Sequence, residues 1–529
     1  MNTILQNPVL IVGAGPTGLV LAIELARRQI PCRVVDAKDG PDQTSRSFTL
    51  HAKTMEMLEH MGIAHVFLDG GIKSRGFYFN FKGKDSHPTI DFTGLSTRYP
   101  YVLIYNQNET EARLREHLES TYDIRPEWST RLSALNAENG GFGVTLAHSD
   151  REETIRTDWV VGCDGIHSFV RKAMDLEFKG ENYEGMLMQM MDVRYHDFDG
   201  PDDWIHYYMA KNNFLLITKL PGENHRVLIS NMGEAGGTDM TLRDTFQGLI
   251  DGHFEGSRLD EPKWVTQWTI WKRLATDYRA GNAFLAGDAA HVHSPSGGQG
   301  MNVGMQDAFN LGWKLAMVIK GEAKPELLDT YGLERRPVGE QAIAGTDAMH
   351  DIIMAHGQGM KDRLELTQTD GWRQKTVNRI SGLSYTYRDV VDVPDDLSPP
   401  DGLTPGDRAP DVQLTRRLRV FDLFRHPRLT ALLIPTAGDT SDRDRCQRLL
   451  TGLQERFPKT VKAFVISDRE IPDLEKGHCI EAESGAFEEV YGSSEVSHLY
   501  LVRPDGYVAF HGGLGERDLA FAHLERWFN

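Results

Sequence analysis

Three glycine-rich turns carry the residue types that could bind a nucleotide cofactor. The first, GAGPTG, directly follows the short apolar run 8–12. Its first glycine permits a tight turn, its second lets a pyrophosphate approach the backbone, and its third lets the following helix pack on the strand. The next apolar run, CRVVDA, ends in an acid suited to the hydroxyls of a ribose. This order predicts a binding unit for NAD or FAD, with cofactor contacts from Gly13, Gly15, Pro16, Thr17, Gly18 and Asp36.

Two further turns lie far down the chain. TDWVVGCDGI (157–166) predicts a strand that ends at Asp164 and Gly165, and HSFVRKAM behind it predicts a helix. NAFLAGD predicts a buried strand that ends at Gly287 and Asp288, followed by a glycine-rich loop and a helix. A carboxylate at such a strand end can bind the ribityl chain of a flavin. The N–H groups at the following helix start suit a pyrophosphate or a negatively charged flavin ring.

The loop behind the third turn also contains an H-x-H pair, His291 and His293, which could indicate a metal site. No further clustered ligands accompany the pair, and a flavin already explains the loop. We therefore expect no metal.

The elements that must position these groups alternate between strands and helices, except in the middle of the chain. There, DDWIHYYMA, NNFLLITKL and HRVLISNM are strand-like runs separated by turns. Together with GFYFNF (76–81) they predict an antiparallel sheet over the substrate side of the cofactor. Alternate residues of such a sheet face a pocket, although aromatic residues there are more often ordinary core. The candidate pocket residues are Phe77, Phe79, Tyr207, Tyr208 and Arg226.

Length and charge narrow the functional classes. The chain has 529 residues, enough for two or three domains, and a net charge of -18, which disfavours nucleic acid and anionic membranes as partners. Its four cysteines give no disulfide framework. The N-terminal residues lack the basic region of a signal peptide, and glycines and Glu24 interrupt the apolar run 9–26. We therefore expect a cytoplasmic protein.

Taken together, GAGPTG, CDGIHS and GDAAHVHSPSGGQGMN resemble the three fingerprints of the flavoprotein aromatic hydroxylases, which are single-component FAD monooxygenases. The resemblance covers essentially the whole chain. It implies that Arg46 lies near the FAD pyrophosphate, that Gln107 begins a helix touching the flavin, and that Pro295 lies beside the reactive edge of the ring system. The further implied cofactor residues are Gly298, Gly300, Met301 and Asn302.

The resemblance also implies an α/β architecture. A Rossmann-like FAD-binding domain would comprise 1–182 and 276–400, with 70–105 contributing to the substrate sheet, and the antiparallel substrate domain would be inserted at 183–275. A Pro/Gly/Asp-rich linker would lead into a thioredoxin-like domain at 401–529. Because no redox cysteine follows LLIPTAG, we expect this last domain to be structural or to support a homodimer, and the flavin site to survive its removal.

Within the family, the phenol hydroxylases, pentachlorophenol monooxygenases and methylnitrocatechol monooxygenases are most similar in pattern. The implied cofactors are FAD and NADPH or NADH, and the implied partners are a small phenol and O2. NAD(P)H would reduce FAD, O2 would add at flavin C4a, and the hydroperoxide would transfer oxygen to the ring. The residues implied in catalysis are Tyr207, Arg226, His51, Pro295 and Tyr387.

One departure from the family pattern concerns the proton of the phenol. Phenol hydroxylases often place an aspartate after the family arginine, but SRSFTLHAK contains no carboxylate. Either His51 or a tyrosine takes the proton, or the substrate is acidic enough to arrive ionised, as chloro- and nitrophenols are. Attack at the substituted carbon would then expel chloride or nitrite.

Four alternatives stay open on the sequence. They are an ordinary phenol hydroxylase, a reductase or dehydrogenase that does not use O2, a flavin halogenase and a non-catalytic flavin protein. The halogenase signature W-x-W-x-I-P is missing, since the segment 268–271 does not match it.

Overall fold

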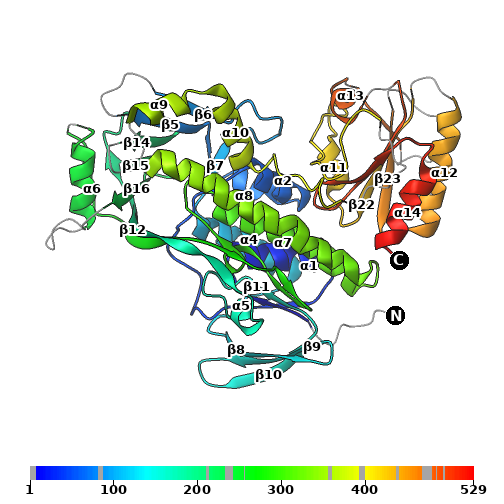
Figure 1. The fold of residues 1–529 in the computed structure, drawn as a ribbon, viewed down its shortest axis with the longest axis horizontal. Coiled ribbons are helices and arrows are strands. Elements are labelled where there is room, and N and C mark those ends of the chain that lie inside the picture. Colours follow the sequence, from blue (N-terminus) through cyan, green and yellow to red (C-terminus); the bar gives the residue numbers. More distant parts are fainter. Residues whose placement is uncertain are drawn as a thin grey trace.

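The computed structural model describes residues 8–529 except 82–86, 210–213, 233–241, 255, 355–359, 392–399, 437–439, 468–478, 484 and 493–494. Much of the predicted linker, 392–399, therefore lies outside the described residues. The part of the molecule that holds the three glycine turns is called the central half below. A large sheet lies on one side of it, and the C-terminal domain packs on the other (Figure 1). No helix within the described ranges is long and apolar enough to cross a membrane.

The central half is built on a five-stranded sheet of order β19-β20-β11-β1-β2. Three of its four pairings are parallel, and the edge strand β19 pairs antiparallel with β20. Parallel strands with both faces covered read as continuous apolar runs, as 8–12 does. The carboxyl ends of β1, β11 and β20 lead into the three glycine turns, so one sheet edge gathers all three. The strands are β1 (Val9–Val12), β2 (Cys32–Val35), β11 (Val160–Gly162), β19 (Arg279–Ala280) and β20 (Ala283–Leu285).

Helices cover this sheet and carry the segments behind each turn. α1 packs against both α4 and α7. α8 is long, contains Pro337, and runs beside α7 (Figure 1). The helices of the central half are α1 (Pro16–Ala26), α2 (Ala52–His60), α3 (Ala64–Leu68), α4 (Gln107–Tyr122), α5 (Phe169–Ala173), α7 (Gly300–Ile319), α8 (Asp329–Met354), α9 (Met360–Thr367) and α10 (Asp370–Ser381), with short 3-10 turns η1 (Gly287–Ala289) and η2 (Pro325–Leu328).

The large sheet has eight strands in the order β21-β18-β12-β16-β15-β14-β5-β6. The three strand-like runs predicted at 202–210, 212–220 and 225–232 do contain strands, at 205–209, 214–219 and 225–232. The sheet is not purely antiparallel, however, because β5 pairs in parallel with β14. The strands are β5 (Gly76–Phe81), β6 (Thr89–Asp91), β12 (Phe178–Val193), β14 (Ile205–Met209), β15 (Phe214–Lys219), β16 (His225–Met232), β18 (Trp264–Ala275) and β21 (His291–Val292).

The sheet's limits differ from those expected. β12 already pairs with β18 from Phe178, five residues before the expected start at 183, and β21 adds an edge strand from the loop behind the third glycine turn. Of the described part of the segment 70–105, β5 and β6 join it. The other two strands of this segment, β4 (Ile72–Ser74) and β7 (Val102–Ile104), instead form a small sheet with β3 (Thr49–Leu50). Pairing depends on long-range contacts, which local strand signals do not specify.

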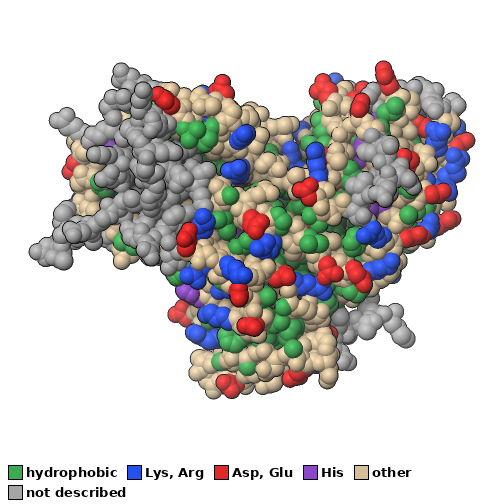
Figure 2. Space-filling model, viewed as in Figure 1, with side chains coloured by type: hydrophobic (Ala, Val, Ile, Leu, Met, Phe, Trp, Pro, Cys, Tyr) green, Lys and Arg blue, Asp and Glu red, His purple; other side chains and the backbone are tan. Residues whose placement is uncertain are grey.

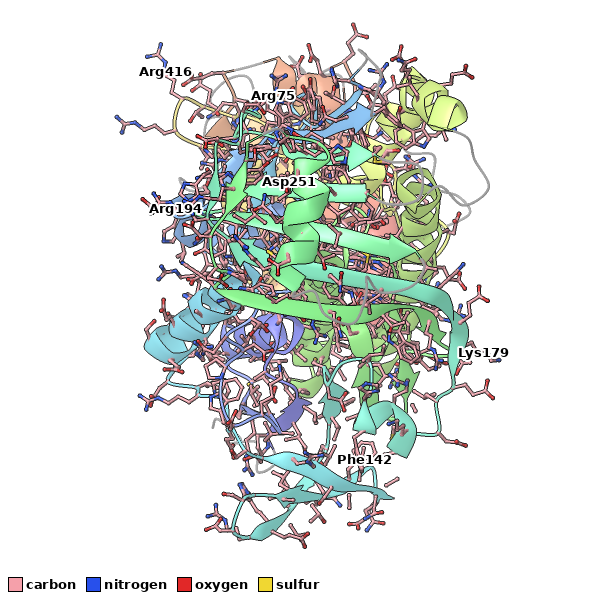
Figure 3. The ribbon with its side chains drawn as sticks, turned by 90° about the vertical axis from the view of Figure 1, so that its left-hand side faces the viewer. Arg75, Phe142, Lys179, Arg194, Asp251 and Arg416 are labelled. Carbon is pink, nitrogen blue, oxygen red and sulfur yellow. The ribbon has the colours of Figure 1, made fainter. Side chains whose placement is uncertain are left out.

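Alternation sorts the side chains of the large sheet between its two faces. Tyr207 belongs to the apolar cluster that faces the glycine loops, whereas Tyr208 belongs to the cluster under α6 (Leu242–Asp251) and packs on Phe254 with ring centroids 4.7 Å apart. Figure 3 faces the sheet and shows α6, marked by Asp251, lying across it. Tyr208 was therefore wrongly included among the pocket candidates, because neighbouring strand residues point to opposite faces.

Two smaller sheets complete the central part. β8 (Arg131–Glu138), β9 (Gly141–Ala147) and β10 (Glu152–Thr157) form an antiparallel sheet that projects at one end of the molecule, where Figure 3 labels Phe142. β13 (Tyr195–His196) pairs with β17 (Arg258–Leu259).

The C-terminal domain contains a mixed sheet of order β24-β23-β22-β25-β26, in which β25 runs antiparallel to its neighbours β22 and β26. Its core is shared with the central half, since Trp313, Met317 and Leu327 belong to the same buried cluster as its strands. The expectation of a removable module therefore conflicts with the packing. Its elements are α11 (Val420–Phe424), β22 (Leu429–Ile434), α12 (Thr440–Arg456), β23 (Val461–Ser467), β24 (Cys479–Glu481), α13 (Ala486–Tyr491), β25 (His498–Val502), β26 (Val508–Gly512) and α14 (Arg517–Trp527).

Candidate functional site: a cofactor cradle beside an aromatic pocket

The first glycine turn has two glycines that packing requires and one that faces free space. Gly13 has φ +107°, and a Cβ there would lie 2.3 Å from the Cys163 carbonyl oxygen. A Cβ on Gly18 would lie 2.0 Å from the Gly13 carbonyl oxygen. Gly15 is half-exposed, with nothing within 4 Å of its Cβ position, and no side chain caps α1 there. The uncapped amides, with Pro16 and Thr17 beside them, suit an approaching pyrophosphate.

The two acids that follow the strands on either side of β1 are anchored by backbone amides. Asp36 accepts hydrogen bonds from the N–H groups of Ala14 (2.8 Å) and Lys38 (2.9 Å), and it stays half-buried beside the turn. Asp164 accepts from the N–H groups of Phe169 (2.7 Å) and Val170 (3.2 Å), the first two amides of α5, while Ser168 is the N-cap residue. Asp164 and Gly165 therefore shape the second turn, while Asp36 keeps lone pairs for a ribose.

The third turn meets the first one. Gly287 has φ +63°, and a Cβ there would lie 2.6 Å from Thr17 Oγ1. The Asp288 side chain is exposed, yet protein surrounds it closely enough for desolvation to raise its pKa, against the attraction of His291 and Arg46. Asp288 is thus an accessible carboxylate beside the first glycine turn, with His291 and Arg46 near enough to act on it. Such a position suits a polyhydroxyl chain such as the ribityl group.

The loop that carries Arg46 is tied to the start of α4. Gln107 donates its backbone N–H to Ser45 Oγ (2.9 Å) and accepts from Ser47 N–H through Oε1 (3.3 Å). Its Nε2 donates to Glu111 at 2.9 Å. Arg46 itself is exposed. Gln107 therefore holds the loop through its backbone N–H and its Oε1, and Arg46 lies near enough to Asp288 to attract its carboxylate.

At the N-terminus of α7, the Asn302 amide is fully used by the protein. Its Oδ1 accepts from His51 N–H (2.9 Å), and its Nδ2 donates to the carbonyls of Thr49 and Gly298 (2.9 Å each). Gly298 has φ +65°, and a Cβ there would lie 2.2 Å from Thr49 Oγ1. The side chain of Asn302 therefore positions the loop, whereas the first amides of α7, at Gly300 and Met301, have no side-chain cap.

An aromatic cluster faces this loop from the large sheet. The Tyr207 ring stacks on Phe79 at 5.3 Å and meets Phe77 edge-on at 5.7 Å, and Phe77 in turn meets Phe92 at 5.7 Å. His51 lies over Phe92 at 6.3 Å. These rings form an apolar wall opposite the glycine loop.

The backbone of Gly297 links Tyr207 and His51. His51 Nε2 lies 2.9 Å from the Gly297 carbonyl oxygen, while the Gly297 backbone hydrogen-bonds to the Tyr207 hydroxyl. Pro295, two residues earlier, accepts from Gly298 N–H at 2.9 Å and closes the turn. The structure thus brings Tyr207, His51 and Pro295 together at one loop.

Burial keeps both titratable groups of this pocket neutral near neutral pH. Burial lowers the pKa of His51 to about 4, partly offset by the carbonyl contacts with Gly297 and Gly298. Burial raises the pKa of Tyr207 well above its ordinary value. His51 is therefore a weak base, and Tyr207 remains a hydrogen-bond donor.

Arg226 lies on the same sheet face but is already paired. Its Nε and Nη2 donate to the two carboxylate oxygens of Asp192, both at 2.8 Å, and the Arg226 side chain is fully buried. Its Nη1 donates to Ser45 Oγ (3.3 Å) and the Ser47 carbonyl (3.4 Å). The hypothesis of a cation free to attract a phenolate is not supported, because Asp192 compensates the charge.

Tyr387 is not part of this pocket. Its hydroxyl accepts from Arg335 Nη1 at 3.1 Å, and its ring lies 4.3 Å from that of Tyr507 in the C-terminal domain. It belongs to a separate buried cluster with Val303. Its predicted place beside the substrate conflicts with these contacts, since the segment after α10 runs toward the C-terminal domain.

Asp307 and Arg335 are functional candidates that the sequence analysis missed. Asp307 Oδ2 accepts from Gly287 N–H (3.1 Å) and lies 2.7 Å from His291 Nε2, while Oδ1 accepts from Arg335 Nε (2.7 Å). All of these side chains are buried. A lone carboxylate in the apolar helix 300–319 was the signal that could have indicated Asp307, because an unpaired buried charge is costly.

The H-x-H pair also has protein partners. His291 pairs with Asp307, and His293 Nδ1 lies 2.9 Å from the Ser294 carbonyl. Within the part of the chain that the structure describes, no group of three or more His, Cys, Asp or Glu side chains could hold a metal ion.

Comparisons with known proteins agree with this geometry. Residues 6–346 match the family model described as FAD binding domain, and residues 403–529 match the model for the C-terminal domain of aromatic-ring hydroxylases. The pentachlorophenol 4-monooxygenase of Sphingobium chlorophenolicum is 47% identical over 97% of this chain and 95% of its own. The 6-methylpretetramide 4-monooxygenase of Streptomyces rimosus is 31% identical over 95% and 90%.

Solved structures show the same fold over nearly the full length. The anhydrotetracycline hydroxylase of Streptomyces rimosus superimposes with a TM-score of 0.77 at 26% identity and 99% coverage of both chains. The flavin-dependent monooxygenase PieE, solved with FAD and substrate, gives a TM-score of 0.80 at 21% identity, covering 98% of this chain and 99% of its own. The cofactor is FAD, and the free space at Gly15, the uncapped start of α1 and the accessible side chains of Arg46 and Asp288 fit it. The chain belongs to the FAD-dependent aromatic-ring monooxygenases, the family of the class A flavin hydroxylases.

Proposed function

We propose that this monooxygenase uses NAD(P)H and O2 to hydroxylate a chloro- or nitrophenol and expels the ring substituent as chloride or nitrite. One observation carries the substrate class: among the pocket residues that the structure describes there is no strong base and no uncompensated cation. His51 has a pKa of about 4, Tyr207 stays protonated, and Arg226 is paired with Asp192. A phenol that must lose its proton in this pocket is favoured when it arrives ionised.

Bound FAD supplies the chemistry that reduces O2 and delivers one oxygen atom to the ring. In the proposed site, the uncapped start of α1 at Gly15 and the side chain of Arg46 bind the pyrophosphate. Asp36 binds the ribose, and Asp288 binds the ribityl chain. The amides at the start of α7 and the loop at Pro295 contact the ring system.

The aromatic wall holds and dehydrates the substrate. The side chains of Phe77, Phe79 and Phe92 are almost fully buried, so the pocket between this wall and the Gly297 loop is apolar. Excluding water protects the activated oxygen from wasteful release as hydrogen peroxide, and fixing the ring shortens the search for a reactive geometry. The Tyr207 hydroxyl donates to the phenolate oxygen, and His51 lines the pocket as a neutral side chain.

The proposed reaction balances without a further reagent. One substituted phenol, one O2, one NAD(P)H and one proton give a quinone, oxidised nicotinamide, the acid of the leaving group and water. The leaving group departs with the bonding electron pair, so the ring product is two electrons more oxidised than a hydroquinone. The name of the Sphingobium relative, pentachlorophenol 4-monooxygenase, supports a polychlorinated phenol as substrate.

The finer architecture is also proposed here. The parallel order β19-β20-β11-β1-β2 supports a Rossmann-like cofactor domain with an inserted substrate sheet. The order β26-β25-β22-β23, with β25 antiparallel, supports a thioredoxin-like C-terminal domain. A homodimer in the cytoplasm is the proposed state of the enzyme.

The test follows five quantities across phenol, 4-chlorophenol, 4-nitrophenol and pentachlorophenol, with NADH and NADPH in parallel. These are NAD(P)H oxidation, O2 uptake, quinone, released halide or nitrite, and hydrogen peroxide. We expect the acidic phenols to give the highest kcat/KM. After the NAD(P)H consumed in forming hydrogen peroxide is subtracted, one halide or nitrite ion should be released for each NAD(P)H oxidised. For weakly acidic phenols, kcat/KM should rise with pH along the ionisation of the free phenol.

Unsubstituted phenol serves as the matched control, because its ring is the more reactive toward an electrophile while its hydroxyl is the less acidic. If phenol is hydroxylated best and no halide or nitrite appears, the enzyme is an ordinary phenol hydroxylase.

A further inference from the structure

The turn between β25 and β26 is buried, which is unusual for a hairpin turn. Every residue of 501–510 is buried, including the turn Pro504-Asp505-Gly506. Turns normally lie at the surface, because their backbone groups need water. Here the segment 503–507 enters the central half of the molecule, and Figure 1 shows the C-terminal domain beside α7 and α8.

The base of this hairpin forms an ion network with α7 and α8. Arg503 donates through both Nη atoms to the carboxylate of Glu334, at 2.7 Å each, and through Nε to Asp505 at 3.0 Å. Asn310 donates to Glu334 (2.7 Å) and Asp505 (3.1 Å), and Lys314 donates to Glu334 (2.7 Å). Two cations and two anions balance in this buried quartet.

The tip of the hairpin continues into the cofactor turn through a chain of hydrogen bonds. The Tyr507 ring packs on the Tyr387 ring with centroids 4.3 Å apart and the two side chains share a hydrogen-bonding contact, while the Tyr387 hydroxyl accepts from Arg335 Nη1 at 3.1 Å. Arg335 then donates to Asp307, which holds the Gly287 amide. The chain ends one residue from Asp288.

The hairpin also contacts α2, which starts directly after His51. Lys53 Nζ lies 4.5 Å from the centroid of the Tyr507 ring and 3.5 Å from the Asp505 carbonyl oxygen. A Cβ on Gly506 would lie 2.7 Å from His60 Cε1. The hairpin is therefore packed against the helix behind the substrate pocket as well as the network behind the FAD turn.

We propose that the 503–507 hairpin is a positioning element of the FAD site, with Tyr507 acting through Tyr387, Arg335 and Asp307 to set the Gly287-Asp288 turn. In a dry interior each member of such a chain polarises the next, and a missing member leaves its neighbour unsatisfied. The C-terminal domain is thus part of the cofactor site. This inference concerns the FAD turn alone and holds for any phenol substrate.

Tyr507→Phe and Tyr387→Phe each remove one hydroxyl from the chain and keep the ring packing. Tyr491→Phe is the matched control, because its buried hydroxyl donates to the Pro410 carbonyl at 2.6 Å within the C-terminal domain, away from the FAD turn. All three full-length holoenzymes are compared by Tm, by the FAD Kd from fluorescence titration of the apoprotein, and by the visible spectrum and midpoint potential of the bound flavin.

We expect Tyr507→Phe and Tyr387→Phe to raise the FAD Kd by about two- to tenfold, as for the loss of one buried hydrogen bond, and to shift the flavin spectrum or potential. The double variant should raise the FAD Kd by less than the product of the two single fold-changes, since both substitutions interrupt the same chain. Tyr491→Phe should lower Tm alone. If the FAD Kd and the flavin potential of the Tyr507 variant equal those of the wild type, or if the control changes them as much, the hairpin only stabilises the fold and the proposal fails.

Discussion

Replacing Arg226 by methionine tests whether this side chain binds substrate or holds the cofactor loop. The guanidinium forms a fork with Asp192 and also reaches Ser45 and Ser47, which flank Arg46. Methionine keeps much of the side-chain volume and removes every one of these hydrogen bonds. The Asp192 carboxylate then stays buried beside Trp264 Nε1, which donates to it at 3.0 Å.

The expected magnitude follows from burial. Removing one partner of a buried ion pair costs about 3–5 kcal/mol of unfolding free energy, because the other charge is left uncompensated. The double variant Arg226→Met/Asp192→Leu should lie within about 1–2 kcal/mol of the wild type, since an apolar pair of similar volume replaces the ions. Both variants lose the Nη1 contacts to the loop, so both should raise the FAD Kd by about two- to tenfold.

The assay combines urea unfolding of the holoenzyme, the FAD Kd, and steady-state kinetics at saturating FAD with an ionised phenol. If Arg226 holds the cofactor loop, the double variant recovers the unfolding free energy of the wild type but keeps its weakened FAD binding. Its KM for the phenol changes by less than about threefold, because the substitution then acts on the substrate only indirectly. The reasoning is refuted if the double variant binds FAD as tightly as the wild type and its KM rises tenfold or more for ionised phenols alone. A tenfold rise corresponds to about 1.4 kcal/mol of lost binding free energy. Arg226 would then bind the phenolate directly.

Three further outcomes are expected. Asp288→Ala should raise the FAD Kd by about tenfold or more, as for a charge-assisted hydrogen bond, measured by fluorescence titration; unchanged affinity would contradict its place at the ribityl chain. Tyr207→Phe should raise KM for ionised phenols by roughly two- to tenfold with the FAD Kd unchanged, and an unchanged KM would remove Tyr207 from the substrate contact. Mild acid should destabilise the protein. Burial lowers the pKa to about 4 for each of four histidines, namely His51, His225, His511 and His523, so the folded state disfavours their protonation. The stability that these neutral side chains contribute above pH 6.5 is therefore lost as the pH falls toward 4. Each contributes at most about 3 kcal/mol, and urea midpoints that stay constant from pH 7 to pH 4.5 would contradict this.

The face shown in Figure 2 carries acidic and basic side chains that are interspersed. The net charge of -18 is thus not gathered into one acidic field on this face.

The sequence by itself determined the cofactor turns and the strands and helices around them. Gly18 is required locally because a Cβ there would lie 2.0 Å from the Gly13 carbonyl oxygen, and Gly13 and Gly287 adopt positive φ angles (+107° and +63°) that favour glycine. The parallel sheet then brings the three turns to one edge, as apolar runs 8–12, 160–162 and 283–285 indicated. Such features depend on short segments and a fixed period, so they can be predicted without the rest of the chain.

Only the tertiary structure decided which charges and hydroxyls meet. Asp192 and Arg226 lie 34 residues apart and pair across adjacent strands, and Glu334 and Arg503 lie 169 residues apart and pair between domains. Alternation likewise placed Tyr207 in the pocket and Tyr208 behind the sheet. Tyr387, predicted beside the substrate, joins the chain from Tyr507 to the FAD turn. Partner choice over such separations follows from the register of strands and the docking of domains, which residue types and spacing alone do not specify.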